Sequence, residues 1–311
     1  VDVAIAGISG GGGGGGGTVS SVDDLSVNGN LDVSGTLTAN GGIASGDHSV
    51  ALGEGSLAEQ QHSFAMGDRA TASGNNSIVM GYRSTASGHY SVALGRSTKA
   101  TTNSSFAVCE GTEASGLYSV AMGNGTSASA ESSFAMGKST TANGDYSTAI
   151  GNQSKAFGDN STAMGQNTTA SGEFSTAMGY DTTASGKNST TMGQNTDASG
   201  NYSTAMGRST KAYGQYSTAM GSGTVTDANY STVIGKFNDV SDALFVIGNG
   251  QDLLNRGDAL VIDFCNNALF KSDVSIDGSL NMNGYKIFNL TDPVDPSDAT
   301  NFKQTTQADV V

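Results

Sequence analysis

Small and apolar residues alternate in a five-residue motif, Ser-x-Ala-[Met/Leu/Ile]-Gly, that recurs through most of the chain. Its serine stands at fourteen positions between Ser49 and Ser231, and every interval is 14 residues. Five residues are too few for a helix, and the alternation separates the two faces of a short strand. The pattern therefore predicts a stack of equal coils, each beginning with one short strand.

The residues that follow each motif contain a second, shorter strand pattern of the form Thr-x-Ala-x-Gly. Ala72-Ser73-Gly74 and Ala170-Ser171-Gly172 are two examples. Glycine also ends each first strand, from Gly53 to Gly235, and permits a positive φ at the corner of a tight coil; Cys109 is the one exception in this row. Two strands and two turns in every repeat predict an all-β fold, a parallel β-roll (solenoid) with 14-residue coils.

The two faces of the first strand differ in the size of their side chains. Ser, Ala and Gly form a small face, which lets two sheets approach closely inside a narrow roll. The opposite face carries large apolar residues that one coil cannot bury alone, so we expect copies of the chain to associate along this core stripe. The stripe consists of Leu52, Met66, Met80, Leu94, Met122, Met136, Ile150, Met164, Met178, Met192, Met206, Met220 and Ile234.

Aromatic residues recur directly before the repeat serine. Rings that stack one coil apart would hold the register between coils, which is the role we favour; an exposed binding strip is the alternative. This aromatic ladder consists of Tyr90, Tyr118, Tyr146, Phe174, Tyr202, Tyr216 and Tyr230. His48 and His62 occupy the same row one coil apart, about 5 Å from each other on strand spacing, and are the one candidate metal pair.

Composition narrows the functional classes. The chain of 311 residues carries 45 glycines, no tryptophan and a net charge of −14. The acidic balance argues against a nucleic-acid partner, which needs clusters of Lys and Arg. No apolar run approaches 18 residues, so we expect no membrane insertion.

Candidate chemistry is scarce. No insertion interrupts the repeats to form a cleft, so we expect no enzyme, no catalytic residues and no cofactor. The glycine run 10–17 is not followed by Lys-Ser or Lys-Thr and does not read as a phosphate loop. Cys109 and Cys265 lie at least nine coils apart, about 40 Å on strand spacing, too far for a disulfide within one chain.

These repeats resemble the head repeats of trimeric autotransporter adhesins, the YadA-like heads, over about residues 45–236. The resemblance implies a homotrimer of left-handed parallel β-rolls that binds a host cell surface or matrix receptor. The segment Phe245-Val246-Ile247-Gly248-Asn249-Gly250 also resembles the end of such heads.

The flanking sequences resemble stem segments of phage and virus tail fibres. The expected organisation is a Gly-rich flexible segment (1–20), an N-terminal β-stem (21–44), the head roll (45–236), a capping segment (237–272) and a C-terminal β-stem or neck (273–311). Three extracellular functions remain open: a virion fibre for host attachment, a bacterial adhesin head, and a structural filament without a receptor.

Overall fold

The computed structural model describes residues 37–39, 41–265 and 267–271. The expected segments 1–20 and 273–311 lie outside these residues, as does most of the expected stem 21–44. Within the described ranges every helix or strand element is a strand, and the chain contains no helix there. The all-β prediction is confirmed for this part of the chain.

One set of strands, the long-strand sheet, is formed by the repeat motif and the segments that flank the coils. Its strands are β1 (Leu37–Ala39), β3 (Val50–Leu52), β5 (Phe64–Met66), β7 (Ile78–Tyr82), β9 (Val92–Arg96), β11 (Phe106–Glu110), β13 (Val120–Asn124), β15 (Phe134–Lys138), β17 (Thr148–Asn152), β19 (Thr162–Gln166), β21 (Thr176–Tyr180), β23 (Thr190–Gln194), β25 (Thr204–Arg208), β27 (Thr218–Ser222), β29 (Thr232–Lys236), β30 (Phe245–Asn249) and β31 (Asp258–Ile262). The last described strand is β32 (Ala268–Phe270).

The second set, the short-strand sheet, is formed by the two-residue pieces between the motifs. Its strands are β2 (Ile43–Ala44), β4 (Leu57–Ala58), β6 (Thr71–Ala72), β8 (Thr85–Ala86), β10 (Lys99–Ala100), β12 (Glu113–Ala114), β14 (Ser127–Ala128), β16 (Thr141–Ala142), β18 (Lys155–Ala156), β20 (Thr169–Ala170), β22 (Thr183–Ala184), β24 (Asp197–Ala198), β26 (Lys211–Ala212) and β28 (Val225–Thr226).

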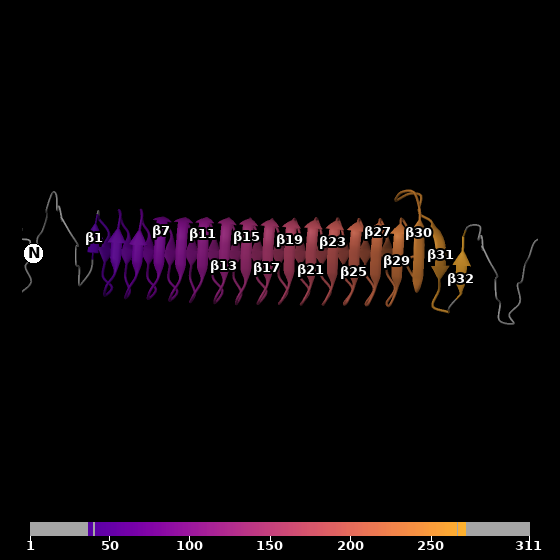
Figure 1. Cartoon of the computed structure of the whole chain (residues 1–311), viewed down its shortest axis with the longest axis horizontal. Coiled ribbons are helices and arrows are strands. Elements are labelled where there is room, and N and C mark those ends of the chain that lie inside the picture. Colours follow the sequence, from indigo (N-terminus) through magenta and orange to yellow (C-terminus); the bar gives the residue numbers. More distant parts are fainter. Residues whose placement is uncertain (1–36, 40, 266, 272–311) are drawn as a thin grey trace, which may run out of the picture. The chain divides into compact units, whose positions relative to one another are not determined.

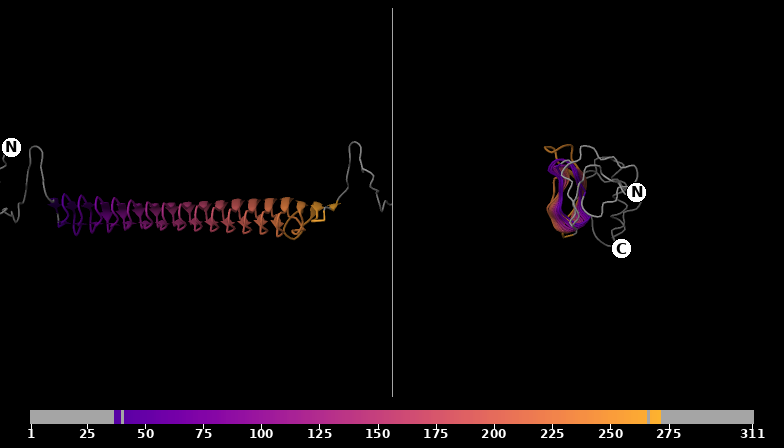
Figure 2. Two further views of the ribbon diagram at one scale, coloured as in Figure 1. Left: turned by 90° about the horizontal axis from the view of Figure 1, so that it is seen from below. Right: turned by 90° about the vertical axis from the view of Figure 1, so that its left-hand side faces the viewer.

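Consecutive coils pair in parallel and in strict register. In β19 and β21, Ala163 lies beside Ala177 and Met164 beside Met178; in the short-strand sheet Ala170 lies beside Ala184. Figure 1 shows the long strands side by side along the roll, and the end view in Figure 2 shows a flattened ring. The predicted parallel β-roll with 14-residue coils is therefore confirmed.

The interior of the roll admits only small side chains. In the coil that begins at Ser161, the inward residues are Ser161, Ala163, Thr168 and Ala170, all with at most 1% of their surface exposed. The same four positions are buried in the coils on either side, and the largest residues found at any of them are Val and Thr. The small face of the motif is thus the inner one, as the alternation predicts.

The repeat serine also ties the turn before it. The Ser49 hydroxyl donates a hydrogen bond to the Gly46 carbonyl over 2.6 Å, and Ser217 does the same to Gly214 over 2.7 Å. A short hydroxyl side chain can reach back to the backbone in this way without filling the interior. Six of the fourteen repeat serines make this contact, whereas the buried hydroxyls of the other eight have no hydrogen-bond partner among the described residues, so the contact stabilises some turns and does not by itself account for serine at this position.

Glycine stands next to last in most of the long strands for two reasons. Gly165 has a φ of 133°, and a Cβ placed on it would overlap the Gly179 carbonyl oxygen in the next coil. The other corners correct the expectation of glycine at every turn. Tyr90 (φ 58°) and Asn167 (φ 56°) adopt the left-handed conformation without being glycine. Ladder hydrogen bonds hold them there, such as that from the Tyr90 amide to the Asn75 carbonyl, 2.9 Å.

The chain after the last coil changes the strand pattern. Thr232 of β29 pairs with Phe245 of β30, and β31 then pairs with β30 in the antiparallel sense, with Val246 beside Val261. At the end of the short-strand sheet, the buried Asn238 side chain bonds both the amide and the carbonyl of Val225, each over 2.8 Å. The Asn238 side chain therefore makes the two hydrogen bonds to Val225 that a further strand of the short-strand sheet would make.

Enlarging an inward residue should disrupt the stack. We expect Ala163→Leu to destabilise the roll by about 1–3 kcal/mol or more, because the opposing sheet leaves no room for the added atoms. Urea unfolding followed by circular dichroism measures the loss. Ala163→Val is the matched control with a smaller cost, since Val79 and Val233 stand at the same place in β7 and β29. Wild-type stability in the leucine variant would show that the interior is loosely packed.

The cysteine in the glycine row should be a strained position. Cys109 has a φ of 92°, in the left-handed region that disfavours a side chain. We expect Cys109→Gly to stabilise the protein by about 1 kcal/mol, the lower end of the cost of such a conformation. Thermal unfolding in reducing buffer measures it, with Cys265→Ser as the thiol control. An unchanged melting temperature in Cys109→Gly would mean that the neighbouring coils absorb the conformation at no cost.

Candidate binding surfaces

The core stripe predicted from the motif lies on the outer face of the long-strand sheet. Five of its thirteen residues are exposed by 36–41%: Met80, Met136, Met164, Met192 and Met220. The rest are half-buried: Leu52, Met66, Leu94, Met122, Ile150, Met178, Met206 and Ile234. Because the coils pair in register, these side chains form one continuous apolar stripe along the outside of the chain.

The aromatic ladder lies at the turn before each long strand, and its rings stack where the aromatics are consecutive. The Tyr216 ring lies 4.8 Å from that of Tyr202 and 5.0 Å from that of Tyr230, with interplanar angles of 4° and 5°. All three remain about half-exposed or more. These stacks join three neighbouring coils through their side chains.

The remaining rings do not form the predicted stack one coil apart. Tyr90, Tyr118, Tyr146 and Phe174 occupy only every second coil, and polar residues such as Ser104 stand between them. Each of these four rings is exposed by 49–66%. The stacking that a register role requires is therefore present at Tyr202, Tyr216 and Tyr230, whereas the other rings project singly from the edge.

The two histidines of the candidate metal pair stack on each other one coil apart. The rings of His48 and His62 lie 5.3 Å apart at 18°, and the His48 Nδ1 lies 3.3 Å from a carboxylate oxygen of Asp47. In the part of the chain that the structure describes, no group of three or more His, Cys, Asp or Glu side chains could hold a metal ion. Cys109 and Cys265 are both free thiols on the surface.

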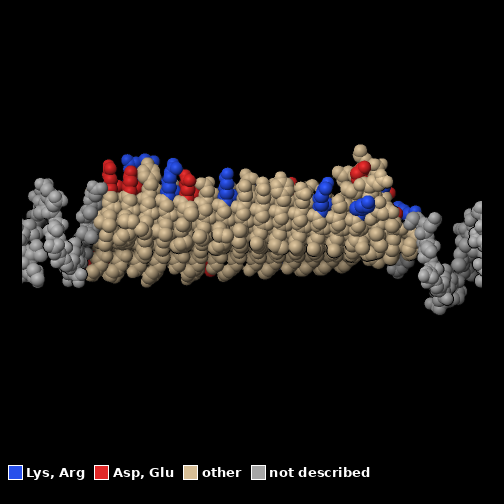
Figure 3. Space-filling view, turned by 45° about the horizontal axis from the view of Figure 1, so that its top comes forward, with Lys and Arg blue, Asp and Glu red and all other residues tan. Residues whose placement is uncertain are grey.

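Charged side chains follow the edges of the roll in short, mixed rows. On the face drawn in Figure 3, basic and acidic residues are interspersed along one edge, and most of the rest of the face carries neither. Arg96 pairs with Glu110 and Lys187 with Glu173, at 2.8 and 2.7 Å. The hydrogen bond to Glu173 raises the pKa of Lys187. These pairs are exposed, so each contributes little stability.

The side chains of an Arg-Gly-Asp tripeptide at residues 256–258 form hydrogen bonds to the backbone at the end of the roll. The Arg256 guanidinium donates to the carbonyls of Gly223 and Asn238, at 3.2 and 3.0 Å. The Asp258 carboxylate, only 4% exposed, accepts from the amides of Asp239 and Val240. A receptor could not reach this carboxylate without opening the cap, so the tripeptide is not a displayed recognition sequence.

The fold and the outer stripe define a β-solenoid repeat protein that carries a row of apolar side chains along its outer face. A family model described as the YadA head domain repeat (2 copies) matches more than half of the chain, which therefore belongs to that adhesin family. The matched ranges are 44–70, 58–84, 72–98, 86–108, 114–140, 142–168, 170–196, 184–210, 198–224 and 212–238. They leave out residues 109–113, where Cys109 interrupts the glycine row.

No curated protein matches the chain significantly. Among the described residues, no helix is both long enough and apolar enough to cross a membrane.

Removing a stacked ring should cost stability. We expect Tyr216→Ser to destabilise the roll by about 1–3 kcal/mol, since it removes two aromatic contacts that each contribute about 0.5–1.5 kcal/mol. Chemical unfolding gives the difference. Tyr118→Ser is the matched control, because Tyr118 stands at the same turn with Ser104 and Ser132 as its neighbours in the row. Equal stability losses in the two variants would contradict the register role of the stacked rings.

Proposed function

We propose that the chain is the head of a homotrimeric cell-surface adhesin, which assembles along the core stripe and mediates attachment to a host cell or matrix receptor. The observation that carries this proposal is the outward apolar stripe on thirteen of the coils. Family membership supports an adhesin and favours a cell surface over a virion.

The apolar side chains of the stripe cannot be fully buried within one chain. The inward positions beside each stripe residue are already filled, as Ala163 and Ala177 are beside Met164 and Met178, with no exposed surface. Turning the methionines inward would also place the small face outside, since alternate residues of a strand point to opposite faces. A partner must therefore cover the stripe from outside, as exposed apolar surfaces of this size typically require.

A second copy of the same chain is the best-matched partner. Its stripe has the same repeat distance, so contacts made at one coil are repeated at every other coil when the copies run parallel. Full burial of a Met or Leu side chain contributes about 1.5–3 kcal/mol. The stripe residues are already more than half buried in one chain, so assembly adds only a fraction of this at each of them; repeated over thirteen residues, the sum is comparable with the roughly 4–15 kcal/mol lost to association. Three rolls around one axis bring every stripe to the centre.

Attachment would then be multivalent. Three parallel rolls present three copies of each exposed turn, including the single rings of Tyr90, Tyr118 and Tyr146. Weak individual contacts can combine into strong overall binding when several are made at once. The net charge of −14 disfavours a nucleic acid as the partner.

A charge in the stripe should dissociate the assembly. We expect Met164→Asp to shift the protein from trimer to monomer in sedimentation velocity, because three carboxylates would be buried together near the axis. Thr169→Asp is the matched control: Thr169 belongs to the same coil but to the short-strand sheet, where Asp197 stands naturally. A trimeric Met164→Asp variant of unchanged stability would contradict the placement of the stripe.

The adhesive role has its own readout. The wild-type trimer should bind to host cells or matrix, and monomeric Met164→Asp should bind much more weakly because its avidity is lost. A correctly assembled trimer that binds none of these surfaces would instead favour a structural filament without a receptor.

A further inference from the structure

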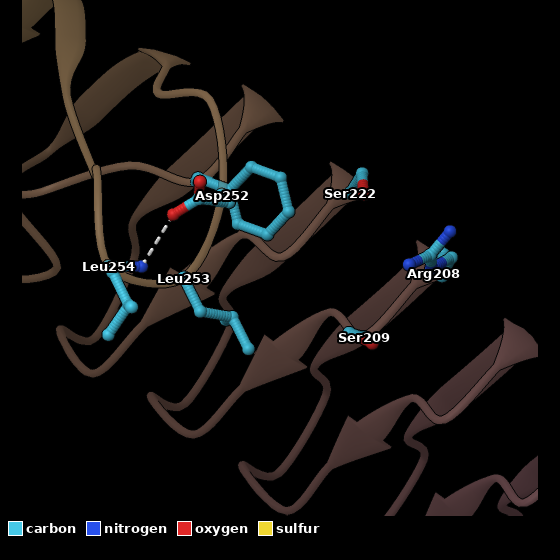
Figure 4. Close-up of a pocket in the computed structure, with 7 residues that line it drawn as sticks. Arg208, Ser209, Ser222, Asp252, Leu253 and Leu254 are labelled. Carbon is cyan, nitrogen blue, oxygen red and sulfur yellow. Dashed lines mark hydrogen bonds between the residues drawn. The ribbon is translucent and has the colours of Figure 1, made fainter.

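A cavity of about 400 Å³ lies at the end of the roll, where the chain between β30 and β31 passes over the last coils. Figure 4 shows Asp252, Leu253 and Leu254 on this loop, facing Arg208, Ser209 and Ser222 at the ends of two long strands. Phe237 completes the lining. A volume of this size is at the lower end of the range that binds small organic molecules in proteins.

The loop that forms one wall is held in shape by its own hydrogen bonds. One Asp252 carboxylate oxygen accepts from the backbone amides of Leu254 and Asn255, at 2.8 and 2.9 Å, and from the Asn255 side chain. These bonds lower the pKa of Asp252. The loop nevertheless presents Leu253 and Leu254 with 63% and 94% of their surfaces exposed. An ordered loop with two uncovered leucines provides a preformed apolar wall.

The aromatic part of the lining depends on one glycine. Gly223 stands at the turn where the preceding coils carry Asn195 and Ser209. A Cβ on Gly223 would overlap the Phe237 ring, so the ring lies directly over this glycine. Phe237 itself is held at a φ of 42°. The last two coils thus differ from the rest of the roll in a way that places an aromatic ring in the cavity.

The opposite side of the cavity carries an available cation. Arg208 is exposed at the end of β25, and within the described ranges it has no ion pair or side-chain hydrogen bond. Arg96, at the same position of an earlier coil, is instead paired with Glu110. The nearby Asp252 carboxylate is engaged by its own loop, which leaves the Arg208 guanidinium and the Ser209 and Ser222 hydroxyls to face a ligand.

We propose that this pocket binds a small organic carboxylate with an apolar body, of the medium-chain fatty-acid type. The carboxylate would accept hydrogen bonds from the Arg208 guanidinium, whose planar fork suits two carboxylate oxygens. The hydrocarbon part would cover Phe237, Leu253 and Leu254 and remove their exposed surface from water. The serine hydroxyls supply further donors. This inference goes beyond the adhesive function and does not depend on it.

Calorimetric titration of the intact chain with decanoate, below its micellar concentration, tests the proposal. We expect saturable binding of one decanoate per chain. Arg208→Gln should weaken it at least tenfold, and Arg208→Lys, which keeps the charge but not the fork, should weaken it less. Leu253→Ser should also weaken binding. Decanol, which has the chain without the charge, should bind at least tenfold more weakly than decanoate.

Lys138→Gln is the matched control, because Lys138 ends β15 at the same coil position as Arg208 but contributes to no pocket. It should bind decanoate like the wild type. Absence of saturable binding, or equal binding by the wild type and Arg208→Gln, would overturn the proposal. Light scattering on the same samples distinguishes failure of this proposal from failure of the proposed trimer. A sample that does not bind decanoate but has the mass of three chains would contradict only the decanoate site.

Discussion

The narrow interior of the roll is the constraint on which the rest of the structure depends. Two sheets that enclose mainly Ser, Ala and Thr side chains, with Val at a few places, lie too close together to accept Met or Phe. The large apolar residues of each coil are therefore forced to the outside, where the chain alone cannot bury them. The internal core of this fold is small, and the assembly that we propose would bury the outer apolar residues against other copies, so it would follow from the same constraint as the coil.

Main-chain hydrogen bonds between neighbouring coils stabilise this fold more, relative to side-chain packing in a core, than they do in a globular domain. Each coil bonds to the next along both sheets and also at the turns, where non-glycine residues adopt the left-handed conformation. A solenoid of this kind depends on contacts between neighbouring coils and must end in a different structure. Asn238, Arg256 and Asp258 provide that end with side-chain groups in place of a further coil. This arrangement also creates the loop over Arg208 and Phe237.

Much of the fold could be predicted because the repeat carries it. The 14-residue period specifies the coil, the alternation within Ser-x-Ala-Met-Gly specifies which face is small, and the outward position of Met164 follows from both. The turns were less predictable. Asn167 is a residue type that adopts a positive φ comparatively easily, but Tyr90 is not, and at Tyr90 a bond from an adjacent coil holds the conformation. Glycine is required only where, as at Gly165, the next coil leaves no space for a Cβ.

The candidate surfaces were predictable to different degrees. The stripe follows from the repeat, but the stacking of aromatic rings depends on whether neighbouring coils both carry one, which separates Tyr216 from Tyr118. The pocket could not be found in the sequence. Its lining comes from the last three coils, at Arg208, Ser222 and Phe237, and from the loop that carries residues 252–254, and their contact depends on the path of the chain through the cap.

The mass of the native particle in solution tests the central claim most directly, because it asks whether the outward stripe is covered by other copies. Light scattering coupled to size-exclusion chromatography should give three times the chain mass of 31.2 kDa, at all concentrations at which the roll is folded. A folded particle of a single chain mass would show that the exposed methionines are stable in water, and would contradict an assembly driven by the narrow interior.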